Sequence, residues 1–156
     1  MVLAPRRGDY RWALRLAVRW DDMDSLGHVN NARYMTYAEA ARLAYFEPLM
    51  GEEPGSRNLG LGMILASISC DFLQQLRYPA DIVVGTRVTH VGRSSLTMEQ
   101  TVFEGERAVA NLRAVMVWFD YAAQKAVPIP DRARAYIAER EGAVAAADRG
   151  ASPEGA

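Results

Sequence analysis

The sequence is poor in the residues that stabilise disulfide-linked or metal-bound folds. Cys70 is the only cysteine among 156 residues, so no disulfide can form within the chain. A free cysteine is among the most buried residue types, and an unpaired thiol favours a reducing compartment. Because no metal-binding motif and no partner histidine surround Cys70, we predict a core residue there, and no metal site.

Other absences exclude whole classes of protein. Lys125 is the only lysine, and 18 basic residues against 19 acidic ones give a formal net charge of −1. This balance argues against nucleic acid or an anionic membrane as a partner. No apolar run approaches the roughly 18 residues of a spanning helix, and residues 1–10 lack the apolar core of a signal peptide. We therefore expect a cytoplasmic protein.

A change of hydrophobic period divides the first third of the chain. Residues 11–20 alternate between apolar and polar, which predicts a half-buried strand. Its buried face would carry Trp12, Leu14, Leu16, Val18 and Trp20. Residues 31–50 instead repeat at three- and four-residue steps, which predicts a helix with Asn30 or Asn31 as its N-cap. The buried stripe of that helix would be Tyr34, Ala38, Ala41, Tyr45 and Leu49.

Four more strands are predicted after a glycine-bearing loop at residues 51–62. They span residues 63–73, 82–91, 96–103 and 108–119, with turns at Gly92-Arg93 and at Glu104-Gly105-Glu106. In the first of these strands, one face would carry Ile64, Ala66, Ile68, Cys70 and Phe72. Pro128 and Pro130 end the sheet, and Asp131 is expected to cap a helix that reaches Glu141.

This order of elements predicts an α+β fold in which an antiparallel sheet wraps around one long central helix. We expect one domain at residues 1–141 and a disordered tail at 142–156, which has too few large apolar side chains to offset its ordering entropy. The strand at 108–119 is expected at the edge of the sheet. It is too apolar to stay exposed there, so we expect at least a homodimer.

The most informative segment is a polar loop directly before the predicted helix. It contains Asp21, Asp22 and Asp24, followed by a glycine, a histidine and two asparagines. Backbone N–H groups at a helix start can bind a developing oxyanion, while a nearby carboxylate attacks or activates water. Asp24 is therefore a candidate nucleophile or general base, and at least one of the other two carboxylates is expected to be solvated.

The motifs around this loop resemble a known family. The run Asp24-x-x-Gly27-His28-Val29-Asn30-Asn31-x-x-Tyr34, followed by Tyr37-x-Glu39-x-x-Arg42, resembles the hotdog-fold acyl-CoA thioesterases of the 4-hydroxybenzoyl-CoA thioesterase type. The order of elements matches that family along residues 9–138. The resemblance implies hydrolysis of an acyl-CoA or acyl-carrier thioester by a homodimer or homotetramer whose active site lies between protomers. It implies no cofactor besides the coenzyme A of the substrate.

The resemblance also implies roles for individual residues. The family's catalytic aspartate falls on Asp24, with His28 and Asn31 beside it, and backbone N–H groups of Asn30 and Asn31 would polarise the thioester carbonyl. The plant acyl-carrier-protein thioesterases place an asparagine where this chain has Leu26, so the bacterial type of mechanism is favoured. Substrate contacts are expected from Gly27, Asn30, Tyr34, Arg93, Ser94 and Ser95, the last three as a cradle for coenzyme A.

Simpler interpretations stay open for several of these residues. His28 could be a hydrogen bonder that fixes the loop, Gly27 could serve a positive φ angle, and Arg93 could belong to a plain hairpin. Glu39 and Arg42 are predicted to form an ion pair on the helix surface or at a dimer seam. Two other functions also stay open: a hydratase or dehydratase of the same fold, whose usual motif is missing, and an acyl-CoA-binding domain, which would not need Asp24.

Overall fold

The computed structural model describes residues 4–50, 61–142 and 145–146. Its main helix is α1 (Asn31–Phe46), and a second helix, α2 (Asp131–Glu141), follows the sheet. The long strands are β1 (Trp12–Ala17), β2 (Leu61–Phe72), β3 (Asp81–Val91), β4 (Ser95–Glu104) and β5 (Arg107–Asp120). Two short strands, β6 (Lys125–Ala126) and β7 (Ala145–Ala146), and three short 3-10 helices complete the described elements. Within these residues, no helix is long and apolar enough to cross a membrane.

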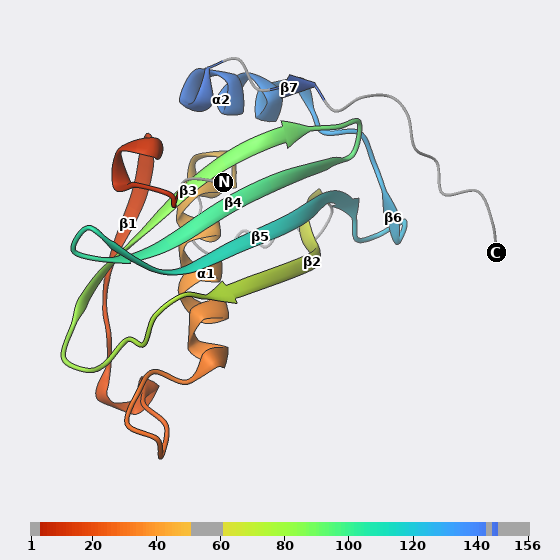
Figure 1. Cartoon of the computed structure of the whole chain (residues 1–156). Helices are drawn as coiled ribbons and strands as arrows, with labels where there is room; N and C mark the ends of the chain where they lie inside the picture. The colour runs from red at the N-terminus through yellow and green to blue at the C-terminus, as the bar shows by residue number, and fades with distance from the viewer. Residues whose placement is uncertain (1–3, 51–60, 143–144, 147–156) are drawn as a thin grey trace, which may run out of the picture.

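The long strands form one antiparallel sheet in the order β1-β3-β4-β5-β2. β6 pairs with the end of β5, and β7 runs parallel to the end of β3. Figure 1 shows the sheet curved across α1, which lies against one of its faces. The predicted α+β fold, a curled antiparallel sheet around one long helix, is confirmed. The predicted domain boundary at residue 141 and the disordered tail stay predictions, because 143–144 and 147–156 lie outside the described residues.

The core forms where the apolar stripe of α1 meets the concave face of the sheet. All five predicted stripe residues are buried, with exposed fractions between 0% and 7%. They pack against inward-facing strand residues such as Val84, Met98 and Ala114. The stripe and the start of the helix therefore follow the prediction, while α1 ends at Phe46 and a short 3-10 helix, Glu47–Leu49, continues it.

Four details of the predicted strands and caps are wrong. β1 ends at Ala17, and Trp20 is 76% exposed because the chain turns into a short 3-10 helix, Trp20–Asp22. β5 is not an edge, since it lies between β4 and β2. α2 begins after Pro130 in the N-cap position, so Asp131 is its first residue rather than its cap. The fourth error concerns β2.

A bulge in β2 changes which side chains face the core. The register with β5 shifts between Leu65 and Ser67, so the alternation before the bulge is out of step with the alternation after it. Ile68 and Cys70 pack against the core as predicted, whereas Ile64 is 39% exposed. The single row predicted along this strand is therefore wrong, because the bulge divides it into two.

One charged side chain of α1 lies inside the core. Arg42 is only 6% exposed, and its Nη1 donates a 3.1 Å hydrogen bond to Oε1 of Gln100 on β4. Among the described residues no ion pair joins Arg42 to Glu39. The predicted surface pair is wrong, because Arg42 points toward the sheet while Glu39 is exposed.

Candidate active site

The loop before α1 folds back on itself and gathers the candidate catalytic groups. Met23 and Val29 form an isolated antiparallel bridge, and the Asp24 N–H donates to the His28 carbonyl at 2.9 Å. The Leu26 N–H donates to Oδ1 of Asp24 at 2.9 Å. Gly27 has a φ of +84°, and no atom lies within 4 Å of where a Cβ would be. The left-handed backbone conformation, rather than a lack of space, therefore accounts for a glycine at this position. The half-buried side chains of Asp24 and His28 therefore lie in one tight turn.

The start of α1 leaves one backbone donor available beside this turn. Asn30 is the N-cap, as predicted, and its Oδ1 accepts the Ala32 N–H at 2.9 Å. Its own N–H is already bonded to the carbonyl of Asp22 at 2.9 Å. No hydrogen bond from the Asn31 N–H is found within the described part of the chain. Of the two amides expected to polarise a carbonyl, Asn31 is the one left to do so.

Asp22 holds this loop on the helix, a role that the sequence did not reveal. The side chain is 4% exposed, and its Oδ2 accepts the Tyr37 hydroxyl at 2.6 Å and the Arg19 N–H at 2.8 Å. Arg33 lies 3.5 Å from Oδ1. Burial, and then the hydrogen bond to Asp22, raise the pKa of Tyr37, so its phenol stays a proton donor. The neighbouring Asp21 is exposed and pairs with Arg19, as expected of a solvated carboxylate.

Tyr34 lies in the core rather than on the surface of the loop. It is 3% exposed, and its ring makes an edge contact with Phe72, with centroids 5.3 Å apart. Burial raises the pKa of its phenol. The structure therefore places Tyr34 among core residues, and the predicted substrate contact of its side chain stays a prediction.

The turn that carries Arg93, Ser94 and Ser95 lies far from the Asp24 loop. The loop lies beside the segment that leads into β3. The Val18 N–H, just before the loop, donates to the Ala80 carbonyl at 2.8 Å, and the Val29 N–H, at its end, donates to the Leu76 carbonyl at 2.8 Å. The turn follows the other end of β3, and an eleven-residue strand spans roughly 33 Å. Figure 1 shows the two segments at opposite ends of the molecule. One chain therefore does not bring the predicted coenzyme A cradle to Asp24.

The backbone of this turn is firmly anchored, whereas the Arg93 side chain is exposed. The Arg93 carbonyl accepts the Ile129 N–H at 2.8 Å and Nη2 of Arg134 at 2.9 Å. The Ser94 carbonyl accepts the Trp118 N–H at 2.7 Å. The turn thus presents an exposed guanidinium from a fixed backbone, which suits the binding of a phosphate.

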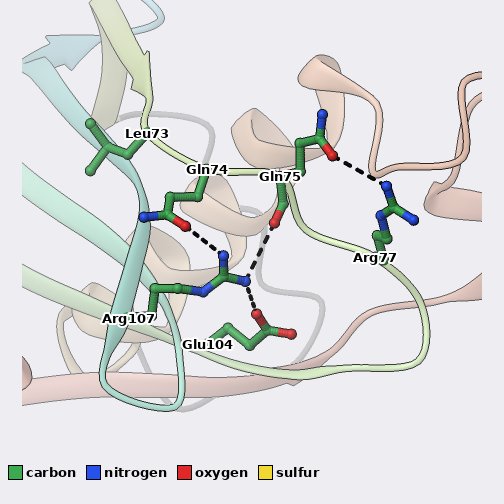
Figure 2. A pocket seen from close by; sticks show the side chains of 6 residues that line it. All are labelled: Leu73, Gln74, Gln75, Arg77, Glu104 and Arg107. Atoms are coloured by element: carbon green, nitrogen blue, oxygen red, sulfur yellow. Dashed lines mark hydrogen bonds and ion pairs between the residues drawn. The ribbon is translucent and has the colours of Figure 1, made fainter.

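An open polar cavity of about 500 Å³ is lined by the segment between β2 and β3 and by Glu104 and Arg107 of β4 and β5 (Figure 2). The segment that lines it contacts the loop, because the Val29 N–H donates to the Leu76 carbonyl at 2.8 Å. Arg107 donates to Gln74 at 2.7 Å and also pairs with Glu104. Because the Arg107 guanidinium already bonds these protein groups, the cavity is a weaker candidate for anion binding than the Arg93 turn.

The described residues support neither a metal site nor catalysis by the Cys70 thiol. No group of three or more histidine, cysteine, aspartate or glutamate side chains is placed to hold a metal ion there. Burial, and to a lesser degree Asp71, raise the pKa of the Cys70 thiol to about 11. The thiol therefore stays protonated at neutral pH, and its contacts with the core agree with the predicted core role.

Comparison with known proteins assigns the chain to a family. The family model of the Thioesterase-like superfamily matches residues 18–137, which include the loop, α1 and most of the sheet. The chain belongs to this superfamily, as its resemblance to hotdog-fold thioesterases predicted. Membership supports a thioester hydrolase as the class of enzyme.

Solved structures and curated relatives agree with this assignment. A thioesterase from Thermus thermophilus, solved with coenzyme A and zinc, is 31% identical over 86% of this chain and 97% of its own, with a TM-score of 0.75. A Pseudomonas aeruginosa protein is 28% identical over 90% of this chain and 99% of its own, with a TM-score of 0.79. A chloroplastic acyl-acyl carrier protein thioesterase of Arabidopsis thaliana is 24% identical over 80% of this chain. The chain spans 55% to 66% of the length of the curated relatives it matches.

Proposed function

We propose that the protein hydrolyses an acyl-CoA thioester to the free acid and coenzyme A. The observation that carries this proposal is the Asp24 carboxylate in a tight turn beside the Asn31 N–H, which bonds to no other group in the described part of the chain. The Asn31 amide, at the positive end of α1, would donate to the thioester oxygen as negative charge develops there. His28, in the same turn, would orient the substrate or the attacking water.

Two routes are open to Asp24. As a nucleophile, a carboxylate oxygen attacks the carbonyl carbon, the C–S bond breaks, and the thiolate leaves; water then hydrolyses the mixed anhydride. As a general base, Asp24 takes a proton from the water that attacks the same carbon. Both routes end in the acid and the thiol. Release of free thiol from a panel of acyl-CoA chain lengths tests the proposal directly, and no release from any of them would contradict it.

Relatives support both coenzyme A and acyl carrier protein as the carrier. The Thermus thermophilus thioesterase holds coenzyme A, and the Arabidopsis thaliana relative is named for acyl carrier protein. We favour coenzyme A because it offers more phosphate groups than the phosphopantetheine arm of acyl carrier protein, and the exposed Arg93 guanidinium is suited to phosphate. A hydratase or dehydratase would instead act on enoyl-CoA, and a binding domain would bind without turnover. A cytoplasmic location is supported by the single unpaired Cys70.

A second copy of the chain would complete the site. β2 is an edge strand of the sheet, and large apolar side chains are exposed along it, on α1 and just after the 3-10 helix that continues α1. Leu43 is 60% exposed, Met50 is 55% exposed, and Leu65 is 39% exposed. A homodimer joined at β2 would cover these groups, and two such dimers would form a homotetramer. It would also bring the Arg93 turn of one protomer to the Asp24 loop of its partner.

We expect Leu65→Lys to dissociate the dimer and remove activity. A lysine on an edge strand opposes strand pairing, and its charge would be buried in the interface. Light scattering at low micromolar concentration measures the mass, and thiol release measures activity on the same sample. Ala135→Lys, at an exposed position of α2, is the matched control and should stay dimeric and active. A monomeric wild-type protein with full activity would refute the shared site.

Arg93→Ala should raise KM for acyl-CoA more than it lowers kcat. A contact with phosphate, far from the reacting carbon, contributes mainly uniform binding. The fold should persist, because the turn is anchored by the Arg93 carbonyl and not by its side chain. Steady-state kinetics with acyl-CoA and with a truncated acyl-pantetheine thioester test this, since only the first carries the nucleotide phosphates. Equal losses with both substrates would remove Arg93 from the coenzyme A site.

A further inference from the structure

A hollow of about 270 Å³ lies between α1 and the bulged part of β2. Its walls are mainly apolar and include Leu43 and Phe46 from the helix and Met63 and Leu65 from the strand. Glu39 lies on its rim, and Arg42 contributes the one buried charge among its described lining residues. We call this hollow the α1–β2 groove.

The guanidinium of Arg42 reaches into the α1–β2 groove with unused donors. Nη1 is bonded to Gln100, whose Nε2 is in turn held by the Ala38 carbonyl at 2.9 Å and the Thr86 hydroxyl at 3.1 Å. No partner for Nε or Nη2 of Arg42 is found among residues 4–50, 61–142 and 145–146. Neither atom is among the fully buried side-chain nitrogens and oxygens without a partner in those ranges, and Arg42 lines the groove. Nε and Nη2 are therefore the donors that Arg42 can offer to a group bound there.

The groove lies on the same face of α1 that starts at the candidate site. Ala32, Met35, Glu39, Leu43 and Phe46 follow one another at three- and four-residue steps, so they share one face of α1. From Asn31 to Arg42 the helix rises roughly 16 Å. A thioester carbonyl held at Asn31 would thus direct its acyl chain along this face toward Arg42.

We propose that Arg42 selects acyl chains whose far end carries an oxygen, as a hydroxyl or a carboxylate. The inference rests on the proposed thioesterase function and deepens it by naming the acyl group. A plain alkyl end would cover the guanidinium and leave its donors unpaired, which is unfavourable in an apolar groove. A carboxylate accepts both available N–H groups, while a hydroxyl accepts from Arg42 and donates to Glu39 on the rim.

Three acyl-CoA esters of equal chain length test this inference: the unsubstituted chain, its ω-hydroxy form and its ω-carboxy form. We expect kcat/KM of the wild-type dimer to favour at least one oxygenated ester over the plain one by roughly 10- to 100-fold, the range of a hydrogen bond to a charged group. Arg42→Gln should bring this ratio close to one, and Arg42→Lys should keep part of the preference for the carboxylate. Arg113→Gln, an exposed arginine of β5, is the control and should leave the ratio unchanged.

Equilibrium binding of the same three esters to Asp24→Asn protein gives the comparison without turnover. Equal affinity and equal kcat/KM for the three esters in wild type would overturn the inference and leave the thioesterase function intact. Absence of hydrolysis with all three would contradict the thioesterase function, and the binding ratio would still decide the role of Arg42. Dissociation of the dimer by Arg42→Lys and Arg42→Gln alike, with no wild-type preference, would overturn the inference and assign Arg42 to the protein interface instead.

Discussion

We expect Asp24→Asn to lower kcat for the proposed acyl-CoA hydrolysis by about 100-fold or more, while the protein stays folded. An amide can neither attack the thioester carbon nor accept a proton from water, and loss of general base catalysis alone accounts for a decrease of this order. The loop should keep its shape, because the Oδ1 of an asparagine still accepts the Leu26 N–H that Asp24 accepts at 2.9 Å.

A neighbouring carboxylate provides the matched control for this experiment. Asp21 lies three residues earlier, is exposed, and forms its ion pair with Arg19 at 3.0 Å. Asp21→Asn should therefore leave kcat and KM near their wild-type values. Circular dichroism of both variants checks the fold. Wild-type turnover by Asp24→Asn would remove this aspartate from the mechanism, and an equal loss in both variants would indicate a general effect of loop charge.

We expect Asp22→Ala to destabilise the protein and to abolish activity through its effect on the loop. The substitution removes the acceptor of the Tyr37 hydroxyl and of the Arg19 N–H from a site that is 4% exposed. Two hydrogen bonds to a buried charge are together worth about 3 kcal/mol or more. The midpoint of thermal unfolding should fall by roughly 10 °C for a chain of this size. Activity should fall because the Asp24 turn loses its attachment to α1.

Tyr37→Phe separates the hydrogen bond from the carboxylate itself. It keeps Asp22 with its backbone and arginine partners, so we expect a loss of only about 1–2 kcal/mol of unfolding free energy. Urea denaturation with both variants measures the difference. An Asp22→Ala protein that unfolds at the wild-type urea concentration would show that the network does not hold the loop.

Patterns within one element predicted most of this fold. The three- and four-residue period of α1 identified its buried stripe, and Gly105, with a φ of +61°, lies in the predicted hairpin turn. The errors arose where pairing with a neighbouring strand determines the conformation or the position of a strand. The bulge at Leu65 depends on pairing with β5, and the edge strand depends on the order of strands in space. The local hydrophobic period of the sequence predicts neither the bulge nor the order of the strands.

For the candidate site, too, the predictions from neighbouring residues succeeded and those that depend on distant parts of the fold did not. Asp24, Gly27, His28, Asn30 and Asn31 adjoin in sequence, and the structure brings them together. The sequence did not reveal that Asp22 is buried, because its partners Arg19, Arg33 and Tyr37 meet only once the loop folds onto the helix. The predicted surface pair of Arg42 was wrong, because the burial of this arginine depends on residues far along the chain. The arginine, for example, bonds a residue 58 positions away. The predicted coenzyme A cradle stays a prediction, since its relation to the loop depends on a second copy.

The end of α2 carries a consequence for synthesis of the protein. Oε1 of Glu141 accepts the Val88 N–H at 3.0 Å and also the hydroxyl of Tyr45, which lies 96 residues earlier. A growing chain that has already made α1 and β3 must therefore wait for nearly all of the domain before these two donors are satisfied. Contacts of such long separation slow folding. The apolar stripe of α1 thus leaves the ribosome well before its cover is complete, so apolar surface stays exposed during synthesis.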